Sequence, residues 1–423
     1  MDIKITPSGV SGTLNAVSSK SFSHRLLICA ALAERETEIR NNCFSDDILA
    51  TIRCLGAMGC KTDFLPGKDG IRITPMGKPQ KPSVTLDCGE SGCTARFLMP
   101  VAASFFDGFT VNGTGKLPYR PFAPLCAALA DAGCSFNSNG FPITCHGKIQ
   151  AGNFRIAGDI SSQFVSGLLF ALPLLDADSR IEITTPLQSA GYVEMTVRVL
   201  AMFGIECSSG LCANGFFIKG NQVYKSPEFA VAEGDWSNAA FFLCMAAIAG
   251  RLSLKGLSAD SAQGDKAVLK ILESFGAETS FSGDTAAVSA GNLHGMEIDA
   301  SQIPDLVPPL AVVAALAEGR TRIYNAQRLR LKESDRIQST FKMLRSLGAD
   351  AKTTDDGLIV EGGKKLHGGI VDACCDHRIV MAAATAACVC ENPVVITGCD
   401  AVNKSYPSFF DDFKMIGGNT RVL

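Results

Sequence analysis

One sequence pattern occurs six times along this chain: a helix-forming segment that ends in glycine and is followed by a short β-prone segment. The final glycines are Gly59, Gly133, Gly204, Gly276, Gly348 and Gly417. Successive glycines lie 74, 71, 72, 72 and 69 residues apart, so the period is nearly constant. A repeat of this length means that the 423 residues form six copies of one supersecondary unit.

Each copy predicts an amphipathic helix that a glycine closes in the left-handed backbone region, followed by a β-hairpin. The two strands of the hairpin are visible in the first copy at 60–64 and 71–74. They are visible again in the fifth copy at 349–353 and 358–360.

A second series of helices alternates with the first and is apolar on all sides. These helices are expected to begin near Lys20, Cys93, Ser162, Trp236, Asp305 and His377, with gaps of 73, 69, 74, 69 and 72 residues. A helix that is apolar all round must be buried. We therefore expect an α/β (α+β) protein of two similar lobes, each with three repeats, with helices inside and sheets outside. A solenoid is the alternative, but it would need polar capping repeats, and neither terminal copy differs from the others.

Composition excludes several classes of function. The formal net charge is -3, which is no electrostatic footprint for binding nucleic acid or a membrane surface. The first residues carry no secretory or organelle signal, and the apolar runs are about half a membrane span, so we expect a cytoplasmic protein without a transmembrane segment. The 17 cysteines include no Cys-x-x-Cys, and no His-Glu-x-x-His occurs, so we expect no metal site and mostly free thiols.

Charged and hydroxyl side chains gather at the starts of the predicted helices. An apolar helix is a poor place for charge, yet helix N-termini and nearby hydroxyls make good anion sites. Singly, such residues are equally well explained as helix caps or surface ion pairs. Their shared phase in the repeat favours a cleft that binds small, multiply anionic ligands. Its cations would be Lys20, Arg25, Arg96, Arg120, Arg336, Arg378 and Lys404.

At these positions the sequence resembles the enolpyruvyl transferases, and among them the 5-enolpyruvylshikimate-3-phosphate synthases. The resemblance covers essentially the whole chain. The motifs occur in order at 19–25 (SKSFSHR), 91–96 (SGCTAR), 117–121 (LPYRP), 161–163 (SSQ), 233–235 (EGD), 303–305 (IPD), 332–336 (KESDR), 376–378 (DHR) and Lys404.

The resemblance implies the two-lobed enolpyruvyl-transferase fold of six βαβαββ-type repeats. One lobe would comprise residues 20–227, mainly on the shikimate-3-phosphate side, and the other residues 1–12 plus 228–423, with the active site in the cleft between them. The implied reaction transfers the enolpyruvyl group of phosphoenolpyruvate to the 5-hydroxyl of shikimate 3-phosphate and releases phosphate, without a cofactor. We expect a monomer whose partners are these two small substrates.

The resemblance also implies two sets of binding residues. The phosphoenolpyruvate site would consist of Lys20, Gly92, Arg96, Arg120, Gln163, Arg336, Arg378 and Lys404. The shikimate-3-phosphate site would consist of Lys20, Ser21, Arg25, Ser161, Ser162, Gln163, Ser189, Tyr192, Asp305 and Lys332.

The chemistry explains why such residues are needed. A positioned acid must protonate C3 of the enol ether, for which Glu333 and Lys20 are candidates, and a base must take the hydroxyl proton, for which Asp305 is the candidate. Cations stabilise the departing phosphate. The chain departs from the family pattern at Glu90 and Phe97, near the expected phosphoenolpyruvate site. Gly92 keeps room for glyphosate, the inhibitor that the family binds there, so we expect inhibition by glyphosate.

Two alternatives remain. A UDP-N-acetylglucosamine enolpyruvyl transferase has a similar length and fold, but its loop cysteine is missing between Gly113 and Arg120. A non-catalytic or RNA-end-binding relative would share the repeat, but the acidic net charge disfavours RNA.

Overall fold

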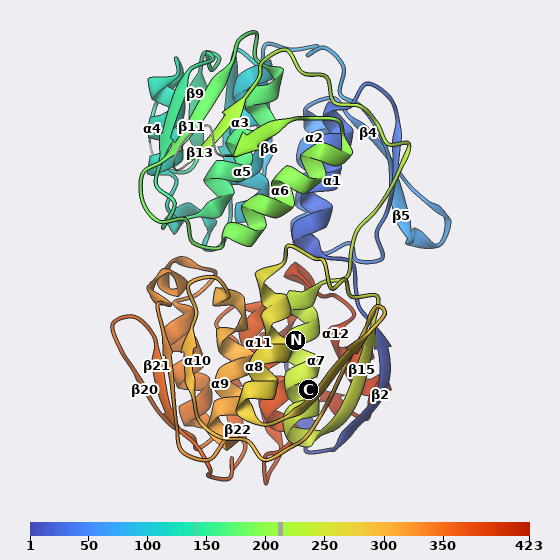
Figure 1. The fold of residues 1–423 in the computed structure, drawn as a ribbon, viewed down its shortest axis with the longest axis vertical. Coiled ribbons are helices and arrows are strands. Elements are labelled where there is room, and N and C mark those ends of the chain that lie inside the picture. The colour runs from blue at the N-terminus through green and yellow to red at the C-terminus, as the bar shows by residue number, and fades with distance from the viewer. Residues whose placement is uncertain (139, 210–214) are drawn as a thin grey trace. The chain divides into compact units, whose positions relative to one another are not determined.

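The computed structural model describes residues 1–138, 140–209 and 215–423 (Figure 1). The chain divides into two compact units. We call Lys20–Ala232 the central unit, and Met1–Ser19 together with Glu233–Leu423 the terminal unit.

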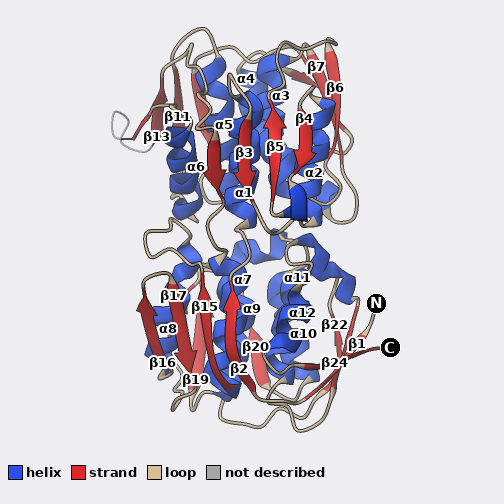
Figure 2. Ribbon diagram, turned by 90° about the vertical axis from the view of Figure 1, so that its right-hand side faces the viewer, coloured by secondary structure: helices blue, strands red, loops and turns tan. Residues whose placement is uncertain are grey.

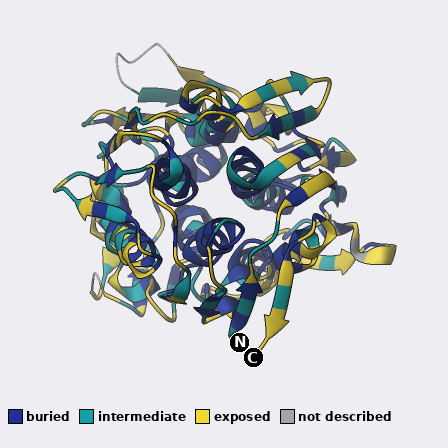
Figure 3. Ribbon diagram, turned by 90° about the horizontal axis from the view of Figure 1, so that it is seen from below, coloured by how far each residue is buried: buried dark blue, intermediate teal, exposed yellow. Residues whose placement is uncertain are grey.

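The apolar helices begin at or beside their predicted starts. In the central unit they are α1 (Lys20–Leu32), α3 (Gly92–Phe105) and α5 (Ser162–Ala171). In the terminal unit they are α7 (Trp236–Ala249), α9 (Val307–Leu316) and α11 (His377–Ala387). The last three contact one another, and almost all of their side chains are buried. Figure 3 colours these helices dark blue along their length, whereas the strands alternate between buried and exposed positions.

The amphipathic helices are confirmed in all six copies within the described residues. They are α2 (Asp46–Ala57), α4 (Ala123–Asp131), α6 (Ala190–Met202), α8 (Val268–Phe275), α10 (Arg336–Ser346) and α12 (Phe409–Met415). Each is followed by its predicted glycine, with φ between 72° and 112°. A side chain at such a φ strains the backbone, which explains why glycine recurs there.

The described strands form six four-stranded sheets of one topology (Figure 2). In each sheet the first two strands are parallel and the remaining pairs are antiparallel. The central unit has β14 (Phe229–Val231), β3 (Thr37–Arg40), β5 (Gly70–Thr74), β4 (Lys61–Phe64); β6 (Ser83–Asp87), β7 (Gly108–Asn112), β9 (Ile143–His146), β8 (Ser135–Phe136); and β10 (Asn153–Ile156), β11 (Ser179–Ile183), β13 (Gly215–Ile218), β12 (Cys207–Ser209).

The terminal unit repeats this topology three times. Its sheets are β2 (Val10–Asn15), β15 (Gly250–Lys255), β17 (Thr285–Ser289), β16 (Glu278–Ser282); β18 (Glu297–Asp299), β19 (Arg320–Tyr324), β21 (Leu358–Glu361), β20 (Asp350–Thr353); and β22 (Gly369–Asp372), β23 (Val394–Thr397), β1 (Ile3–Thr6), β24 (Asn419–Val422). Short 3-10 helices connect these elements, namely η1 (Pro66–Lys68), η2 (Leu117–Tyr119), η3 (Leu172–Leu174), η4 (Gly264–Ala267), η5 (Pro304–Leu306), η6 (Gln327–Leu331) and η7 (Cys399–Lys404).

The unit boundaries differ from the predicted ones. Residues 228–232 were expected in the terminal unit, but they belong to the central unit because β14 pairs in parallel with β3, with Phe229 opposite Glu38. Conversely, the whole of β2 belongs to the terminal unit because it pairs in parallel with β15, with Val10 opposite Gly250. Each strand therefore stays in the unit that the chain is about to leave.

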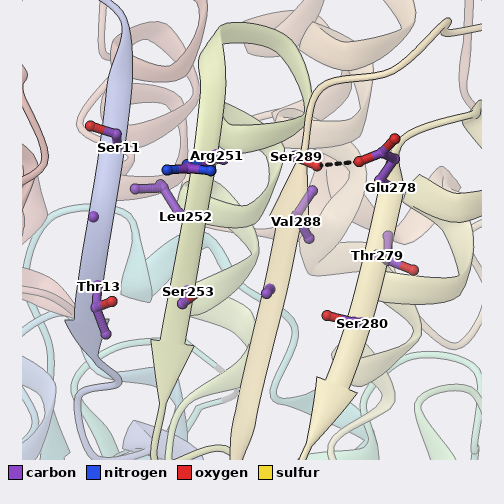
Figure 4. A pocket seen from close by; sticks show the side chains of 12 residues that line it. Ser11, Thr13, Arg251, Leu252, Ser253, Glu278, Thr279, Ser280, Val288 and Ser289 are labelled. Carbon is purple, nitrogen blue, oxygen red and sulfur yellow. Dashed lines mark hydrogen bonds between the residues drawn. The ribbon is translucent and has the colours of Figure 1, made fainter.

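The outer face of the β2–β15–β17–β16 sheet shows how the strands separate polar from apolar residues. Ser11, Arg251, Ser289 and Glu278 lie opposite one another across the four strands, and Ser289 Oγ donates to Glu278 Oε2 at 2.9 Å (Figure 4). They line a groove of about 750 Å³, whereas Leu252, their neighbour along β15, is buried. No helix in the described parts of the chain has the length and hydropathy needed to cross a membrane.

Candidate functional site

The central unit holds the first group of predicted site residues, which we call the Lys20 cluster. It comprises Lys20, Ser21, Arg25, Gly92, Arg96, Arg120, Ser161, Ser162, Gln163, Ser189 and Tyr192. All of them lie at or near the N-terminal ends of α1, α3, α5 and α6, or on η2 and the residue after it. The repeat therefore places the side chains at equivalent ends of equivalent helices.

Lys20 is the first residue of α1, and its ammonium group is paired with a carboxylate. Lys20 Nζ lies 2.7 Å from Asp47 Oδ2, on the first turn of α2. Both side chains are largely buried, with 15% and 6% exposure. Such a pair has little solvent screening, so Asp47 holds the charged end of Lys20 at a defined place.

A chain of buried hydroxyl groups connects α1 and α2 to the loop before α3. His24 Nδ1 lies 2.7 Å from Thr51 Oγ1, and Thr51 Oγ1 lies 2.7 Å from Thr94 Oγ1. Thr94 Oγ1 in turn donates to Ser91 Oγ at 2.8 Å. Burial lowers the pKa of His24 to about 3, so the imidazole stays neutral and acts as a hydrogen-bonding link.

Arg25 is buried, and its guanidinium binds groups of the protein itself. Its Nη1 donates to the carbonyl of Ser21 at 2.6 Å, and its Nη2 to the carbonyl of Tyr192 at 2.7 Å. Its Nε donates to Thr196 Oγ1 at 2.8 Å. Arg25 thereby ties α1 to α6 and fixes the backbone beside two other predicted binding residues, Ser21 and Tyr192.

Arg96 and Gln163 form a second fixed arrangement. Arg96 Nη1 donates to Gln163 Oε1 at 2.8 Å, while Gln163 Nε2 donates to Cys93 Sγ at 2.9 Å. A guanidinium has donors only, so the amide must turn its oxygen to Arg96 and its nitrogen to Cys93. Arg96 is also flanked by the rings of Phe122 and Phe164, at 5.0 and 5.3 Å from their centroids.

Gly92 and Arg120 touch at the start of α3. A Cβ atom added to Gly92 would lie 2.6 Å from Arg120 Nη1 and 2.9 Å from its Cζ. The absence of a side chain at Gly92 therefore lets the Arg120 guanidinium lie against the backbone. Arg120 follows η2, at the end of the predicted 117–121 motif.

Hydroxyl residues begin α5 and precede α6. Ser161 caps α5, because its side chain accepts a hydrogen bond from the Gln163 backbone N–H at 3.3 Å, and Ser162 is the first residue of the helix. Ser189 precedes α6 in the left-handed region, with φ of 52°. A non-glycine residue with this φ is uncommon and often marks a functional position.

The terminal unit holds the remaining predicted residues around Arg336. We call Asp305, Lys332, Glu333, Arg336, Asp376 and Arg378 the Arg336 cluster. Arg336 is 1% exposed, and three carboxylates surround its guanidinium: Asp305 Oδ1 at 2.8 Å, Glu333 Oε2 at 2.6 Å and Asp376 Oδ2 at 2.9 Å. These charges raise the pKa of Arg336 against the opposing effect of burial.

Asp305 contacts three cationic side chains. Besides Arg336, its carboxylate lies 3.3 Å from Arg378 Nη2 and 3.7 Å from Lys332 Nζ. Burial alone would raise the pKa of Asp305, but Arg378, Lys332 and Arg336 hold it well below its usual range. The predicted base is thus an ionised carboxylate that shares its charge among three donors.

The two lysines of this unit have different surroundings. Burial lowers the pKa of Lys332 to about 8, with Asp305 opposing the shift and Arg336 adding to it. Lys404 is the last residue of η7, which packs against α11, and is 7% exposed. Both positions keep a cation in or beside an element of the Arg336 cluster.

Sequence reasoning missed Asp47 and Asp265 as candidate site residues. Asp47 contacts Lys20, and Asp265 contacts Ser237, a partner of Arg378. Both lie just before or within an amphipathic helix of the repeat, at the phase that pointed to 332–336, so applying that phase to every copy would have found them. Among the residues that the structure describes, His, Cys, Asp and Glu form no group of three or more suited to a metal ion.

Comparison with known proteins connects this geometry to one family. The model of the EPSP synthase (3-phosphoshikimate 1-carboxyvinyltransferase) family matches residues 5–413. The 3-phosphoshikimate 1-carboxyvinyltransferase of Clostridium novyi is 42% identical over 99% of this chain and 98% of its own length. The enzyme of the same name from Clostridium acetobutylicum is 43% identical over 99% and 97%.

Solved structures agree with the fold. EPSP synthase from Acinetobacter baumannii superposes with a TM-score of 0.81 at 25% identity, covering 100% of both chains. The enolpyruvyl transferase NikO from Streptomyces tendae has the same fold, with a TM-score of 0.81 at 16% identity over 99% of this chain and 98% of its own. The chain therefore belongs to the EPSP synthase (3-phosphoshikimate 1-carboxyvinyltransferase) family.

Proposed function

We propose that this chain transfers the enolpyruvyl group of phosphoenolpyruvate to the 5-hydroxyl of shikimate 3-phosphate and releases phosphate, on the route to chorismate and the aromatic amino acids. The family membership supports this reaction. We further propose that the Lys20 cluster and the Arg336 cluster act on the same pair of substrates, in a cleft between the two units.

The observation that carries the proposal is the arrangement of Asp305 among Lys332, Arg336 and Arg378. A carboxylate held by three cations suits a reaction in which a proton moves while several negative charges are present. Both substrates are anionic, so cations that already face a carboxylate can be shared with them. Arginine is well suited to the phosphate and carboxylate groups of phosphoenolpyruvate.

Asp305 is the proposed base for the 5-hydroxyl. In the free protein its pKa is held low by its cationic partners, which disfavours proton uptake. An arriving anionic substrate competes for Arg336 and Arg378, and its own negative charge raises the proton affinity of Asp305. Substrate binding would thus make this carboxylate a better base at the moment when the hydroxyl oxygen bonds to C2 of phosphoenolpyruvate.

Glu333 and Lys20 are the proposed acids for C3. As the hydroxyl adds to C2, C3 gains a proton and a tetrahedral intermediate forms. The C2–O bond to phosphate then breaks, and C3 returns the proton to restore the double bond. Lys20, Arg336, Arg378 and Lys404 stabilise the departing phosphate, since each is a buried or half-buried cation.

The other proposed contacts follow the family resemblance. Phosphoenolpyruvate also meets Gly92, Arg96, Arg120 and Gln163. Shikimate 3-phosphate meets Ser21, Ser161, Ser162, Gln163, Ser189, Tyr192 and Lys332, with Arg25 beside them. The helix N-terminal positions of Ser161 and Ser162 support an anion role, because free N–H groups and hydroxyls point from that end of α5.

Phosphate release tests the proposal. Phosphoenolpyruvate is supplied with either shikimate 3-phosphate or UDP-N-acetylglucosamine, and released phosphate is measured for wild type, Asp305→Ala and Asp305→Asn. We expect release only with shikimate 3-phosphate, and a loss of kcat of about 100-fold or more in both variants, the range for removal of a general base. Release with UDP-N-acetylglucosamine would identify the alternative acceptor. No release with either acceptor would overturn the proposal.

We also propose that the enzyme acts as a monomer in the cytoplasm and needs no cofactor. Light scattering during gel filtration tests the first point, with a mass near 44.6 kDa expected. Assay of chelator-treated, extensively dialysed protein tests the last point, with unchanged activity expected.

A further inference from the structure

A buried carboxylate outside the predicted site residues contacts one of them through a serine. Asp265 lies in η4, Ser237 on the first turn of α7, and Arg378 on the first turn of α11. Ser237 Oγ donates to Asp265 Oδ2, and Arg378 Nη2 donates to Ser237 Oγ at 3.2 Å. Their exposures are 1% for Asp265 and 6% each for Ser237 and Arg378, so water barely competes for these contacts.

The directions of these hydrogen bonds are determined by chemistry. A guanidinium has no acceptor, so the oxygen of Ser237 must accept from Arg378. The single hydroxyl proton of Ser237 is then available to Asp265, which must present an oxygen lone pair. An ionised Asp265 always does so, and it makes this a charge-assisted hydrogen bond.

The remaining contacts of Arg378 are with one residue. Its Nη1 donates to the backbone carbonyl of Asp305 at 3.2 Å, and its Nη2 lies 3.3 Å from Asp305 Oδ2. Ser237 therefore contacts the same Nη2 nitrogen from a different element, α7. Without it, the guanidinium would depend on Asp305, whose carboxylate is also shared with Arg336 and Lys332.

We propose that Asp265 is a positioning residue for Arg378, acting through Ser237, and that its ionised form is the one that holds Arg378 ready for phosphoenolpyruvate. The assignment of phosphoenolpyruvate to Arg378 rests on the proposed function. Asp265 itself touches no substrate in this scheme.

The electrostatic surroundings make this arrangement sensitive to mild acid. Burial raises the pKa of Asp265 to about 6, and the charges of Asp305 and Asp235 raise it further, while Arg378 and Ser237 oppose the shift. Asp305 belongs to η5, Asp235 caps α7 and Arg378 belongs to α11, whereas Lys266, next to Asp265, donates to the Ala259 carbonyl. As the pH falls through 6, Asp265 gains a proton and its attraction for the Ser237–Arg378 pair weakens.

Asp265→Asn tests this inference, because asparagine keeps the shape and one acceptor oxygen but has no charge at any pH. The quantity to compare is the ratio of kcat/KM for phosphoenolpyruvate between wild type and variant, measured across the pH range. Titration of the substrates affects both proteins equally and cancels in the ratio. We expect a ratio of about ten at pH 7.5, the size for loss of a charge-assisted hydrogen bond. The ratio should approach one a pH unit below the pKa of Asp265.

Variants of Ser237 separate positioning from a general loss of structure. Ser237→Ala should raise KM for phosphoenolpyruvate with little change in kcat, whereas Ser237→Thr, which keeps the hydroxyl, should restore it. Asp260→Asn, at an exposed carboxylate just before η4, is the matched control and should follow wild type at every pH. A ratio for Asp265→Asn that is independent of pH would overturn the inference, as would equal kinetics for Ser237→Ala and Ser237→Thr.

A second readout does not depend on turnover. The guanidinium resonances of Arg378, identified by their loss in Arg378→Lys, should shift between pH 7.5 and 5 in the wild type and stay constant in Asp265→Asn. If the wild type released no phosphate but this shift occurred, the proposed function would fail while the link from Asp265 to Arg378 would stand. If the protein were active and the shift absent, only the link would fail.

Discussion

Arg336 Nε donates to Asp376 Oδ2 across 2.9 Å, and the two side chains are 1% and 0% exposed. The same carboxylate caps α11 by accepting from the Arg378 backbone N–H at 3.0 Å. One buried ion pair thus joins the start of α10 to the start of α11. It also anchors the guanidinium that Asp305 and Glu333 share.

Replacement of Arg336 by methionine should destabilise the protein strongly. The change keeps much of the side-chain volume but leaves Asp305, Glu333 and Asp376 without their central cation. Loss of one partner from a buried ion pair costs about 3–5 kcal/mol of the free energy of unfolding. Urea denaturation measures this, with Arg320→Met as the control, because the Arg320–Glu361 pair is exposed and should contribute below about 1 kcal/mol. Equal losses in the two variants would contradict the expectation.

Affinity for shikimate 3-phosphate should fall in mild alkali because of Lys332. Burial lowers the pKa of this lysine to about 8, so its charge is present below that pH and is lost as the pH rises through it. Arginine stays charged throughout this range. We therefore expect KM for shikimate 3-phosphate to rise above pH 8 in the wild type and to stay level in Lys332→Arg. Parallel profiles for the two proteins would assign the alkaline limb to another group.

Cys93 should matter as a hydrogen-bond acceptor for Gln163. Cys93→Ala removes the atom that accepts from Gln163 Nε2, which frees the amide to turn away from Arg96. We expect about a tenfold rise in KM for phosphoenolpyruvate, the usual scale for one hydrogen bond to a charged network. Cys93→Ser keeps an acceptor and should stay within about threefold of wild type by the same reasoning. If serine were as damaging as alanine, packing rather than hydrogen bonding would explain the effect.

Gly92→Ala should displace Arg120, because the new Cβ would lie 2.6 Å from Arg120 Nη1. A guanidinium at the end of a flexible side chain can move, so we expect intact folding, a higher KM for phosphoenolpyruvate and weaker inhibition by glyphosate. Steady-state kinetics with and without glyphosate measure both. Gly56→Ala is the control, since nothing lies within 4 Å of its added Cβ in α2, and it should be neutral in activity. A wild type insensitive to glyphosate would contradict the sequence-based expectation.

Much of the fold could be predicted because its signals are local. The glycines after α2, α4, α6, α8, α10 and α12 mark a backbone conformation that other residues adopt only with strain, and the all-apolar helices mark burial. The candidate site was partly visible for the same reason. Lys20, Asp305 and Arg378 have charged or polar groups at helix starts, where the repeat does not otherwise require them.

The tertiary structure alone decided the pairings between distant segments. That β14 stays with β3, and β2 with β15, depends on sheet edges formed by residues far away in the chain, so the predicted boundary at 227–228 was wrong. The partners of the site residues were hidden likewise. Asp47, Ser237 and Asp265 acquire their meaning from atoms that approach within hydrogen-bonding distance only after folding. Periodicity specifies where a helix begins and which side is buried, whereas the choice of partner depends on the packing of whole units.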